Sequence, residues 1–347
     1  MRRLFFVLVA LATAATASAC GNTSTSTDSH TIVVATHDSW AMPKSVLAAF
    51  EKRTGYHVKI EQQGDAGELT NKLVLTKDSP IADAVYGIDN TFATRATDAG
   101  VIADYRSPAL PATAKSFELT GSGAGRLNPV DYSDVCVNVD DQWFAQHHLA
   151  KPTSFDDLTK PAYKDLLVVP AATTSSPGLA FLVATIAAKG DGWQSYWKAL
   201  LANGAKIVPG WTEAWQGDYT DGGGGGSRPI VVSYSSSPPD TIAKGTNRPR
   251  TSALLGTCFR QVEYAGVVAG ARNSKGARAF VDFLLSKAAQ SSMPENMYVY
   301  PVDPHADIPT TWSRWAPAAK HPWAMSAQTI ASDRTQWLSQ WRDLIAK

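Results

Sequence analysis

The 347-residue chain has little charge, few cysteines and no long apolar run beyond its first 20 residues. Asp, Glu, Lys and Arg make up 18% of the chain, below the roughly 25% that is usual for soluble domains. Because 32 basic residues face 31 acidic ones, the composition gives no sign of nucleic-acid binding. No later apolar segment approaches the roughly 20 residues that cross a bilayer. A hydrophobic fraction of 44% excludes a largely disordered chain.

Sequence motifs for catalysis, metal binding and phosphate-loop chemistry are also missing. The seven histidines form no His-x₃-His pair, and no Gly-x-Ser-x-Gly elbow occurs. The run Gly222–Gly226 lacks the Lys-Ser/Thr ending of a phosphate loop, and we interpret it as a flexible surface turn. We therefore expect a protein that is not an enzyme and that needs no metal and no cofactor.

The first residues have the pattern of an export signal. A positively charged start precedes an apolar stretch at residues 4–12, and small residues lead up to Cys20. This cysteine resembles that of the bacterial lipobox, which is acylated and becomes the mature N-terminus; ordinary cleavage near Ala19 is the alternative. We expect a signal peptide at 1–19 and a lipidated, flexible tether at 20–30. The mature protein would then be anchored to the outer face of the cell membrane, in the periplasmic space or cell envelope.

Two cysteines remain after the lipidated one. An exported protein folds in an oxidising compartment, so we expect a disulfide between Cys136 and Cys258. Two separate buried thiols are the alternative. Two cysteines without zinc-type spacing do not make a zinc site.

From Thr31 onward, strand-like and helix-like segments alternate. The expected strands are 31–36, 57–62, 82–88, 166–170, 206–208 and 229–234, and the expected helices are 44–53, 68–77, 91–99, 179–188, 193–202, 277–287 and 332–346. This alternation predicts an α/β fold with βαβ units and mainly parallel sheets flanked by helices. In the last helix, Trp337 and Trp341 recur at helical spacing and are expected to pack in the core.

The economical arrangement is two lobes between which the chain crosses more than once. We expect one lobe to contain residues 31–130 and 235–290, and the other to contain 131–234 and 291–347, with approximate boundaries.

Side chains suited to ligand binding follow several expected strands, where α/β sheets bind their ligands. The aromatic candidates are Trp40, Trp211, Trp215 and Tyr234, each with core packing as its alternative, and the acidic ones are Asp38, Asp65 and Asp89. Tryptophan faces attract cations. Ser175 and Ser176 precede a helix, whose N-terminus attracts anions, and Ser235, Ser236 and Ser237 add hydroxyl donors. Together these residues predict a flat, cationic ligand that can carry a phosphate.

Several ordered motifs resemble the thiamine-binding substrate-binding proteins of bacterial ABC importers. They are Asp65-Ala66-Gly67, Ala84–Asn90, Asp131-Tyr132, Thr174–Leu179, Gly210–Ala214, Ser233–Pro238 and Tyr300-Pro301-Val302, spread over about residues 31–345. The resemblance implies a two-lobed type II periplasmic-binding-protein fold with the ligand in the interlobe cleft. It also implies thiamine or its mono- and diphosphate as the ligand and a membrane permease with its ATPase as partner. We further expect a monomer.

Ligand-binding residues are carried over from the resemblance by position. They fall on Asp65, Ala66, Ser175, Ser176, Trp211, Tyr234, Ser235, Ser236 and Ser237, and His37, Asp38, Trp40, Asp89, Glu213 and Trp215 are further candidates. The chain departs from the family after its first strand, where His37-Asp38-Ser39-Trp40 replaces Tyr-Asp-Ser-Phe. Ala66 also replaces a glycine of the family. Trp40 is a possible substitute for a family tryptophan that this chain lacks.

Two other functions remain open at this point. One is a binding protein for a different solute, such as ferric iron, a polyamine or a sugar. The other is a secreted thiaminase-like enzyme, for which Cys136 is the nucleophile to test.

Overall fold

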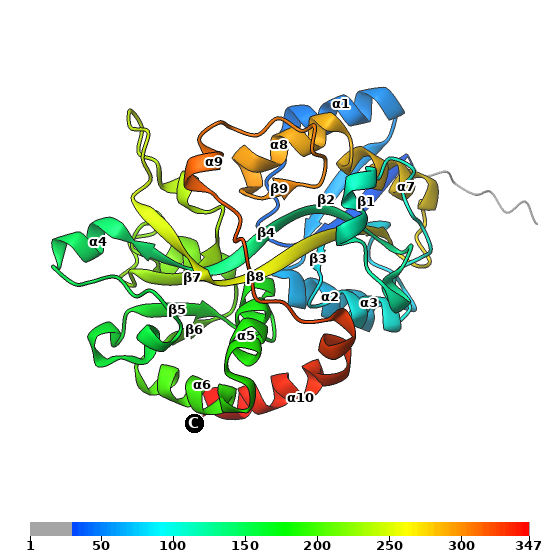
Figure 1. The fold of residues 1–347 in the computed structure, drawn as a ribbon. Coiled ribbons are helices and arrows are strands. Elements are labelled where there is room, and N and C mark those ends of the chain that lie inside the picture. The colour runs from blue at the N-terminus through cyan, green and yellow to red at the C-terminus, as the bar shows by residue number, and fades with distance from the viewer. Residues whose placement is uncertain (1–29, 347) are drawn as a thin grey trace, which may run out of the picture.

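The computed structural model describes residues 30–346, which form a two-lobed α/β protein (Figure 1). The strands are β1 (Thr31–Thr36), β2 (His57–Gln62), β3 (Ala84–Asp89), β4 (Leu127–Asp140), β5 (Leu167–Pro170), β6 (Lys206–Val208), β7 (Ile230–Tyr234), β8 (Thr251–Val267) and β9 (Tyr300–Pro301). The helices are α1 (Lys44–Thr54), α2 (Ala66–Leu75), α3 (Ala93–Asp98), α4 (Asp141–Gln146), α5 (Ser176–Lys189), α6 (Trp193–Ala202), α7 (Ser274–Leu284), α8 (Lys287–Met297), α9 (Trp312–Trp315) and α10 (Ala327–Ile345).

Every strand and helix expected from the sequence is present, with ends that differ by a few residues. The sequence pattern did not indicate the two longest strands, β4 and β8. The signal peptide, Cys20 and the tether up to residue 29 lie outside the described residues. Within residues 30–346, no helix is long and apolar enough to span a membrane.

Across the described residues, nine strands join in a single sheet. Its order is β2-β1-β3-β8-β4-β7-β5-β6, with β9 paired to β4. The pairs at the two ends of the sheet, β1 with β2 and β3 and β5 with β6 and β7, are parallel. The central pairs that involve β4 and β8 are antiparallel. The sheet is therefore mixed, with a parallel part in each lobe.

β4 and β8 connect the lobes. β8 pairs with β3 near Val267 and with the last residue of β4 near Thr251, so one strand passes from one lobe to the other. In Figure 1 both strands cross the middle of the molecule. The first lobe contains β1–β3 with α1–α3, α7 and α8, and the second contains β5–β7 with α4–α6.

The expected disulfide is confirmed, because Cys136 and Cys258 are bonded and their Cα atoms lie 4.2 Å apart. Both side chains are fully buried, and they join β4 to β8 across 122 residues of chain. The bond therefore lies on the two strands that run through both lobes.

Helix α10 packs against both lobes, through α3 and α6 (Figure 1). Trp341 is fully buried, and its ring meets that of Trp197 edge to face with centroids 5.7 Å apart. Trp337 is 9% exposed and belongs to the same apolar cluster. The expectation that these two tryptophans serve packing is confirmed.

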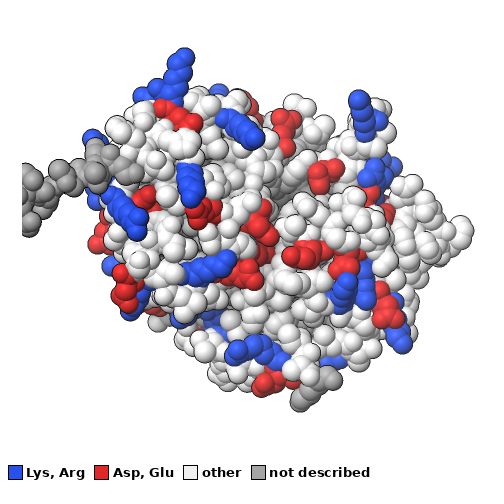
Figure 2. Space-filling view, turned by 180° about the vertical axis from the view of Figure 1, so that it is seen from behind, with Lys and Arg blue, Asp and Glu red and all other residues white. Residues whose placement is uncertain are grey.

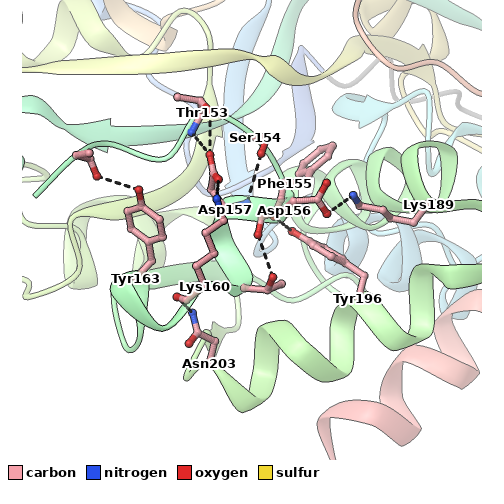
Figure 3. A network of polar contacts seen from close by, with 12 residues as sticks. Thr153, Ser154, Phe155, Asp156, Asp157, Lys160, Tyr163, Lys189, Tyr196 and Asn203 are labelled. Atoms are coloured by element: carbon pink, nitrogen blue, oxygen red, sulfur yellow. Dashed lines mark hydrogen bonds and ion pairs between the residues drawn. The ribbon is translucent and has the colours of Figure 1, made fainter.

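The segment around residues 153–163 is held to the second lobe by polar contacts (Figure 3). The Tyr196 hydroxyl donates to the carbonyl of Phe155 at 3.0 Å, and Lys189 Nζ lies 2.6 Å from Asp156. Asn203 donates to the Lys160 carbonyl at 2.9 Å. These contacts tie the loop to α5 and α6, which form the wall behind the strands of this lobe.

Candidate binding cleft

A cavity of about 310 Å³ opens between the lobes, within the size range of small-molecule sites. Its walls come from the loop after β1, from β3, β7 and β8, from the turns after β6 and β7, and from the end of α8. The lining residues are His37, Asp38, Ser39, Trp40, Ala41, Tyr86, Trp211, Trp215, Gln216, Tyr234, Ser237, Asp240, Glu263, Asn296, Met297, Tyr298 and Val299. Figure 2, seen from behind, shows a hollow between the lobes with acidic side chains along its margins.

One wall of the cavity is a pair of stacked tryptophans. The rings of Trp211 and Trp215 are nearly parallel, with centroids 6.0 Å apart. Trp211 Nε1 donates to Ser233 Oγ at 2.8 Å, and Trp215 Nε1 donates to Asp240 Oδ2 at 3.1 Å. Trp215 is buried, while Trp211 is half-buried, so Trp211 offers the more accessible ring. The hydrogen bonds fix both indoles in place before a ligand arrives.

The other wall carries Trp40, which packs edge-on against Tyr86 with centroids 5.1 Å apart. Beside it, the His37 ring lies 5.4 Å from the Tyr86 ring and its Nδ1 lies 3.0 Å from Ser39 Oγ. The imidazole occupies the space over Gly87, where a Cβ would come within 2.1 Å of the ring. Gly87 has φ +98°, and so this irregular point of β3 suits glycine.

Behind this wall lies a buried acidic group. The Tyr86 hydroxyl lies 2.7 Å from Asp131 Oδ2 and 3.1 Å from Glu263 Oε2, and His37 Nε2 lies 3.6 Å from Glu263 Oε1. Burial, together with the Glu263 charge, raises the pKa of Asp131 well above its usual value. Burial alone would raise the pKa of Glu263, but His37 and hydrogen bonds from Asp131 and Tyr86 lower it. The negative charge of the pair therefore lies on Glu263, which lines the cavity.

The pKa of His37 is also shifted by nearby carboxylates. Burial alone would lower its pKa, but Glu263, and then Asp65 and Asp38, raise it above the ordinary value of 6.5. Protonated His37 therefore partly neutralises Glu263.

Acidic groups dominate the charge of the cavity. Asp38, Asp240 and Glu263 line it, and among the described lining residues there is no Lys or Arg. With aromatic faces on both walls, this environment attracts a flat cation. What the arrangement can do chemically is bind and orient such a molecule.

Beside the cavity, Asp65 joins the two lobes. As the N-cap of α2 it accepts from the backbone N–H of Ala66 at 2.6 Å, and it also accepts from the N–H groups of Ser176 at 3.3 Å and Trp211 at 3.0 Å. Although burial raises the pKa of Asp65, these donors and the Ser175 hydroxyl favour its charged form. A single carboxylate of the first lobe thus holds the N-terminus of α5 and the Trp211 turn of the second.

The expected serines are buried next to this contact. Ser175 caps α5, and Ser176 is buried. The pKa of Asp89 is raised by burial to about 6, although Thr91 and the Phe92 N–H donate hydrogen bonds to it. Ser236 Oγ lies 2.6 Å from Ser133 Oγ, which joins the turn after β7 to β4. The Ser235 hydroxyl has no hydrogen-bond partner within the described part of the chain.

Of the residues selected from the sequence, the cavity lining includes His37, Asp38, Trp40, Trp211, Trp215, Tyr234 and Ser237. The others, Asp65, Ala66, Asp89, Ser175, Ser176, Glu213, Ser235 and Ser236, are outside the lining; several of them form the interlobe contact. A ligand contact at these positions stays a prediction.

Sequence reasoning did not select Tyr86, Asp240, Glu263 or residues 296–299, which also line the cavity. Glu263 comes from the second half of β8, a strand whose pattern was not recognised. A charged residue directly before the apolar run that starts at Tyr264 was the available signal. The thiol considered as a nucleophile, Cys136, is bonded to Cys258 and so is not free to attack a substrate.

Comparison with known proteins agrees with this geometry. The model of the bacterial extracellular solute-binding protein family matches residues 79–237. The chain is 25% identical over 325 residues to the thiamine-binding periplasmic protein of Salmonella typhimurium, covering 91% of this chain and 94% of the relative.

Two solved structures share the fold. One is a periplasmic thiamin-binding protein, with a TM-score of 0.79 and 23% identity over 91% of this chain and 96% of the other. The other is iron-bound HitA from Pseudomonas aeruginosa, with a TM-score of 0.70 and 19% identity over 90% and 99%. The expected type II two-lobed fold is thereby confirmed. The chain is thus similar to bacterial extracellular solute-binding proteins over residues 79–237, and to thiamine-binding periplasmic proteins over most of its length.

Proposed function

We propose that this protein captures thiamine in the cavity between its lobes and delivers it to the permease and ATPase of an importer. The observation that carries the proposal is an interlobe cavity with tryptophans on both walls, three carboxylates and no basic residue other than His37 among its described lining residues. The curated relative that matches 91% of the chain is named for thiamine binding, which supports the same ligand.

The chemistry of thiamine fits these walls. Its thiazolium ring is flat and permanently positive, and a Trp face is the best aromatic surface for a cation. Trp211 supplies that face, and Glu263 supplies a nearby negative charge. The aminopyrimidine ring is a donor that Asp38 or Asp240 can accept from.

We propose that the unphosphorylated vitamin is the preferred form. A phosphate would be expected at the N-terminus of α5, yet Asp65 already accepts from the Ser176 and Trp211 N–H groups there. A second anion would meet the Asp65 carboxylate at short range and be repelled. Binding of a thiamine phosphate would therefore require the Asp65 contact to open, with Ser175, Ser176 and Ser235–Ser237 as its hydroxyl donors.

We further propose that residues 1–19 direct export and that Cys20 carries the lipid that anchors a monomer to the outer face of the membrane. We also propose the lobe boundaries that the sequence predicts. In this proposal the lobes open and close about β4 and β8, the strands that connect them. Export is supported by the disulfide and by the periplasmic location in the name of the relative.

Isothermal titration of the purified protein with thiamine tests the proposal. We expect one site of micromolar or tighter affinity, and Trp211→Ala should weaken it at least tenfold, or about 1.4 kcal/mol, because the cation loses its aromatic face. Trp323→Ala is the matched control, since Trp323 is 36% exposed and lies outside the cavity lining. No binding of thiamine, or equal weakening in both variants, would overturn the assignment.

The rival functions give different results in the same samples. An iron-binding protein would show visible absorbance after loading with ferric iron, and a polyamine- or sugar-binding protein would give heat when that solute is titrated in directly. A thiaminase-like enzyme would release the pyrimidine during incubation with thiamine. Any of these results without reversible thiamine binding would contradict the proposal.

A further inference from the structure

A second cavity of about 310 Å³ lies away from the cleft, where α10 packs beside α3. Arg95 of α3 and Arg334 and Arg342 of α10 line it, and Thr173 reaches it from the loop before α5. We call this site the arginine cavity. It shares no lining residue with the cleft cavity.

The three arginines have no ion-pair partner among the carboxylates of residues 30–346. Arg95 and Arg342 are exposed at the rim. Positive charge is therefore concentrated at this cavity without local compensation by contact.

Arg334 is the central member of the group. Its side chain is only 8% exposed, and its guanidinium lies 6.0 Å from the centroid of the Phe92 ring. The structure gives it one side-chain hydrogen bond, from Nη1 to the carbonyl of Thr91 at 3.0 Å. A guanidinium carries several N–H donors in a planar fork, so most of the donors of a largely buried group are left for something in the cavity.

The surroundings of Arg334 destabilise its charged form. Burial and then the charge of Arg95 lower its pKa, while Asp89 and Asp98 act in the opposite direction from a distance. Like charges gathered around a partly enclosed space are stabilised when an anion enters it.

We propose that the arginine cavity binds a small oxyanion of the phosphate type. A tetrahedral oxyanion accepts paired N–H donors from guanidinium forks, the geometry for which arginine is suited. The hydroxyls of Thr173 and Thr335 and the amide of Asn71 line the same space and can donate to the remaining oxygens. Leu338 and Phe92 supply the apolar part of the cavity lining.

The position of the site gives the bound anion a structural consequence. Arg95 belongs to the first lobe, Thr173 to the second, and Arg334 to α10, which packs against both. Next to it, the N–H of Gly67 donates to the Thr174 carbonyl at 2.9 Å across the same lobe boundary. An anion in the arginine cavity would add a further contact at this boundary.

Titration with inorganic phosphate tests the inference, with the cleft filled by saturating thiamine so that its hydroxyls do not compete. We expect saturable 1:1 binding, and Arg95→Gln or Arg342→Gln should each weaken it about tenfold through the loss of a charged hydrogen bond. Both positions are exposed, so these variants are expected to fold, whereas buried Arg334 is left intact. Arg53→Gln, an exposed arginine of α1, is the matched control and should bind phosphate like the wild type.

Sodium chloride at matched ionic strength separates a specific site from general screening. Heat absent up to tens of millimolar phosphate, equal binding by Arg95→Gln and the wild type, or the same response to chloride would overturn the inference. Thiamine titrations of the same variants should be unchanged, because none of the substituted residues lines the cleft cavity. If thiamine does not bind, the phosphate titration without it still decides this question.

Discussion

The disulfide joins the two strands that connect the lobes, and its contribution to the free energy of unfolding can be predicted. Cys136 and Cys258 close a loop of 122 residues, and reduction frees that loop in the unfolded chain. In the chain-entropy model such a loop contributes about 5 kcal/mol to the free energy of unfolding at 25 °C. With an m-value of about 3 kcal/mol/M in urea, the midpoint of unfolding should fall by about 1.7 M on reduction.

The comparison is best made on the unmodified sequence. Urea unfolding with and without dithiothreitol leaves every side chain in place, so no cavity is created where the bond is broken. β4 and β8 keep their ladder on both sides of the bond, so the reduced protein should still fold. A Cys136→Ala/Cys258→Ala variant supplies the control, since reductant should not change its midpoint. A shift below about 0.3 M, or about 1 kcal/mol at this m-value, would refute the reasoning that this bond limits the unfolded ensemble.

Two further predictions concern the cleft. Protonated His37 repels a cation beside Glu263, and the pKa of His37 is raised above 6.5, so thiamine affinity should increase as the pH rises through that raised value. Thiamine titrations between pH 6 and 8.5 should show a flatter dependence of affinity on pH for His37→Gln than for the wild type. Identical slopes would contradict this prediction. A Cβ at Gly222 would lie 1.6 Å from the Trp215 carbonyl oxygen, so Gly222→Ala should displace Trp215 and weaken thiamine binding. Gly217 has open space around it, so Gly217→Ala should leave the affinity unchanged. Equal affinities of the two variants, measured by calorimetry, would contradict the packing argument.

The short strands and helices could be predicted because their signals are local. β1, β2, α6 and β6 have the bounds expected from the apolar pattern, since each places its apolar residues on a face decided within a few residues. β4 and β8 could not be recognised in this way. Both carry buried polar residues, among them Asp131, Asp134 and Glu263, whose partners are distant in sequence and appear only in the folded protein.

The site was predictable to a similar extent. The aromatic residues after β6 and at the end of β7 were selected because strand ends gather ligands, and Trp211 and Tyr234 do line the cavity. The role of Asp65 between the lobes was not visible, because it depends on backbone N–H groups at Ser176 and Trp211. Gly222–Gly226, interpreted as a flexible turn, lies at the surface with Gly222 and Gly224 in close approach to the Trp215 turn, which a sequence pattern does not reveal.

Native mass spectrometry of the freshly purified protein tests the central claim most directly, because a ligand that co-purifies in the cleft identifies itself by mass. The account predicts one thiamine per chain, either retained from the cell or acquired when thiamine is added, and its loss in Trp211→Ala. A protein that retains a different solute and does not bind added thiamine would contradict the account.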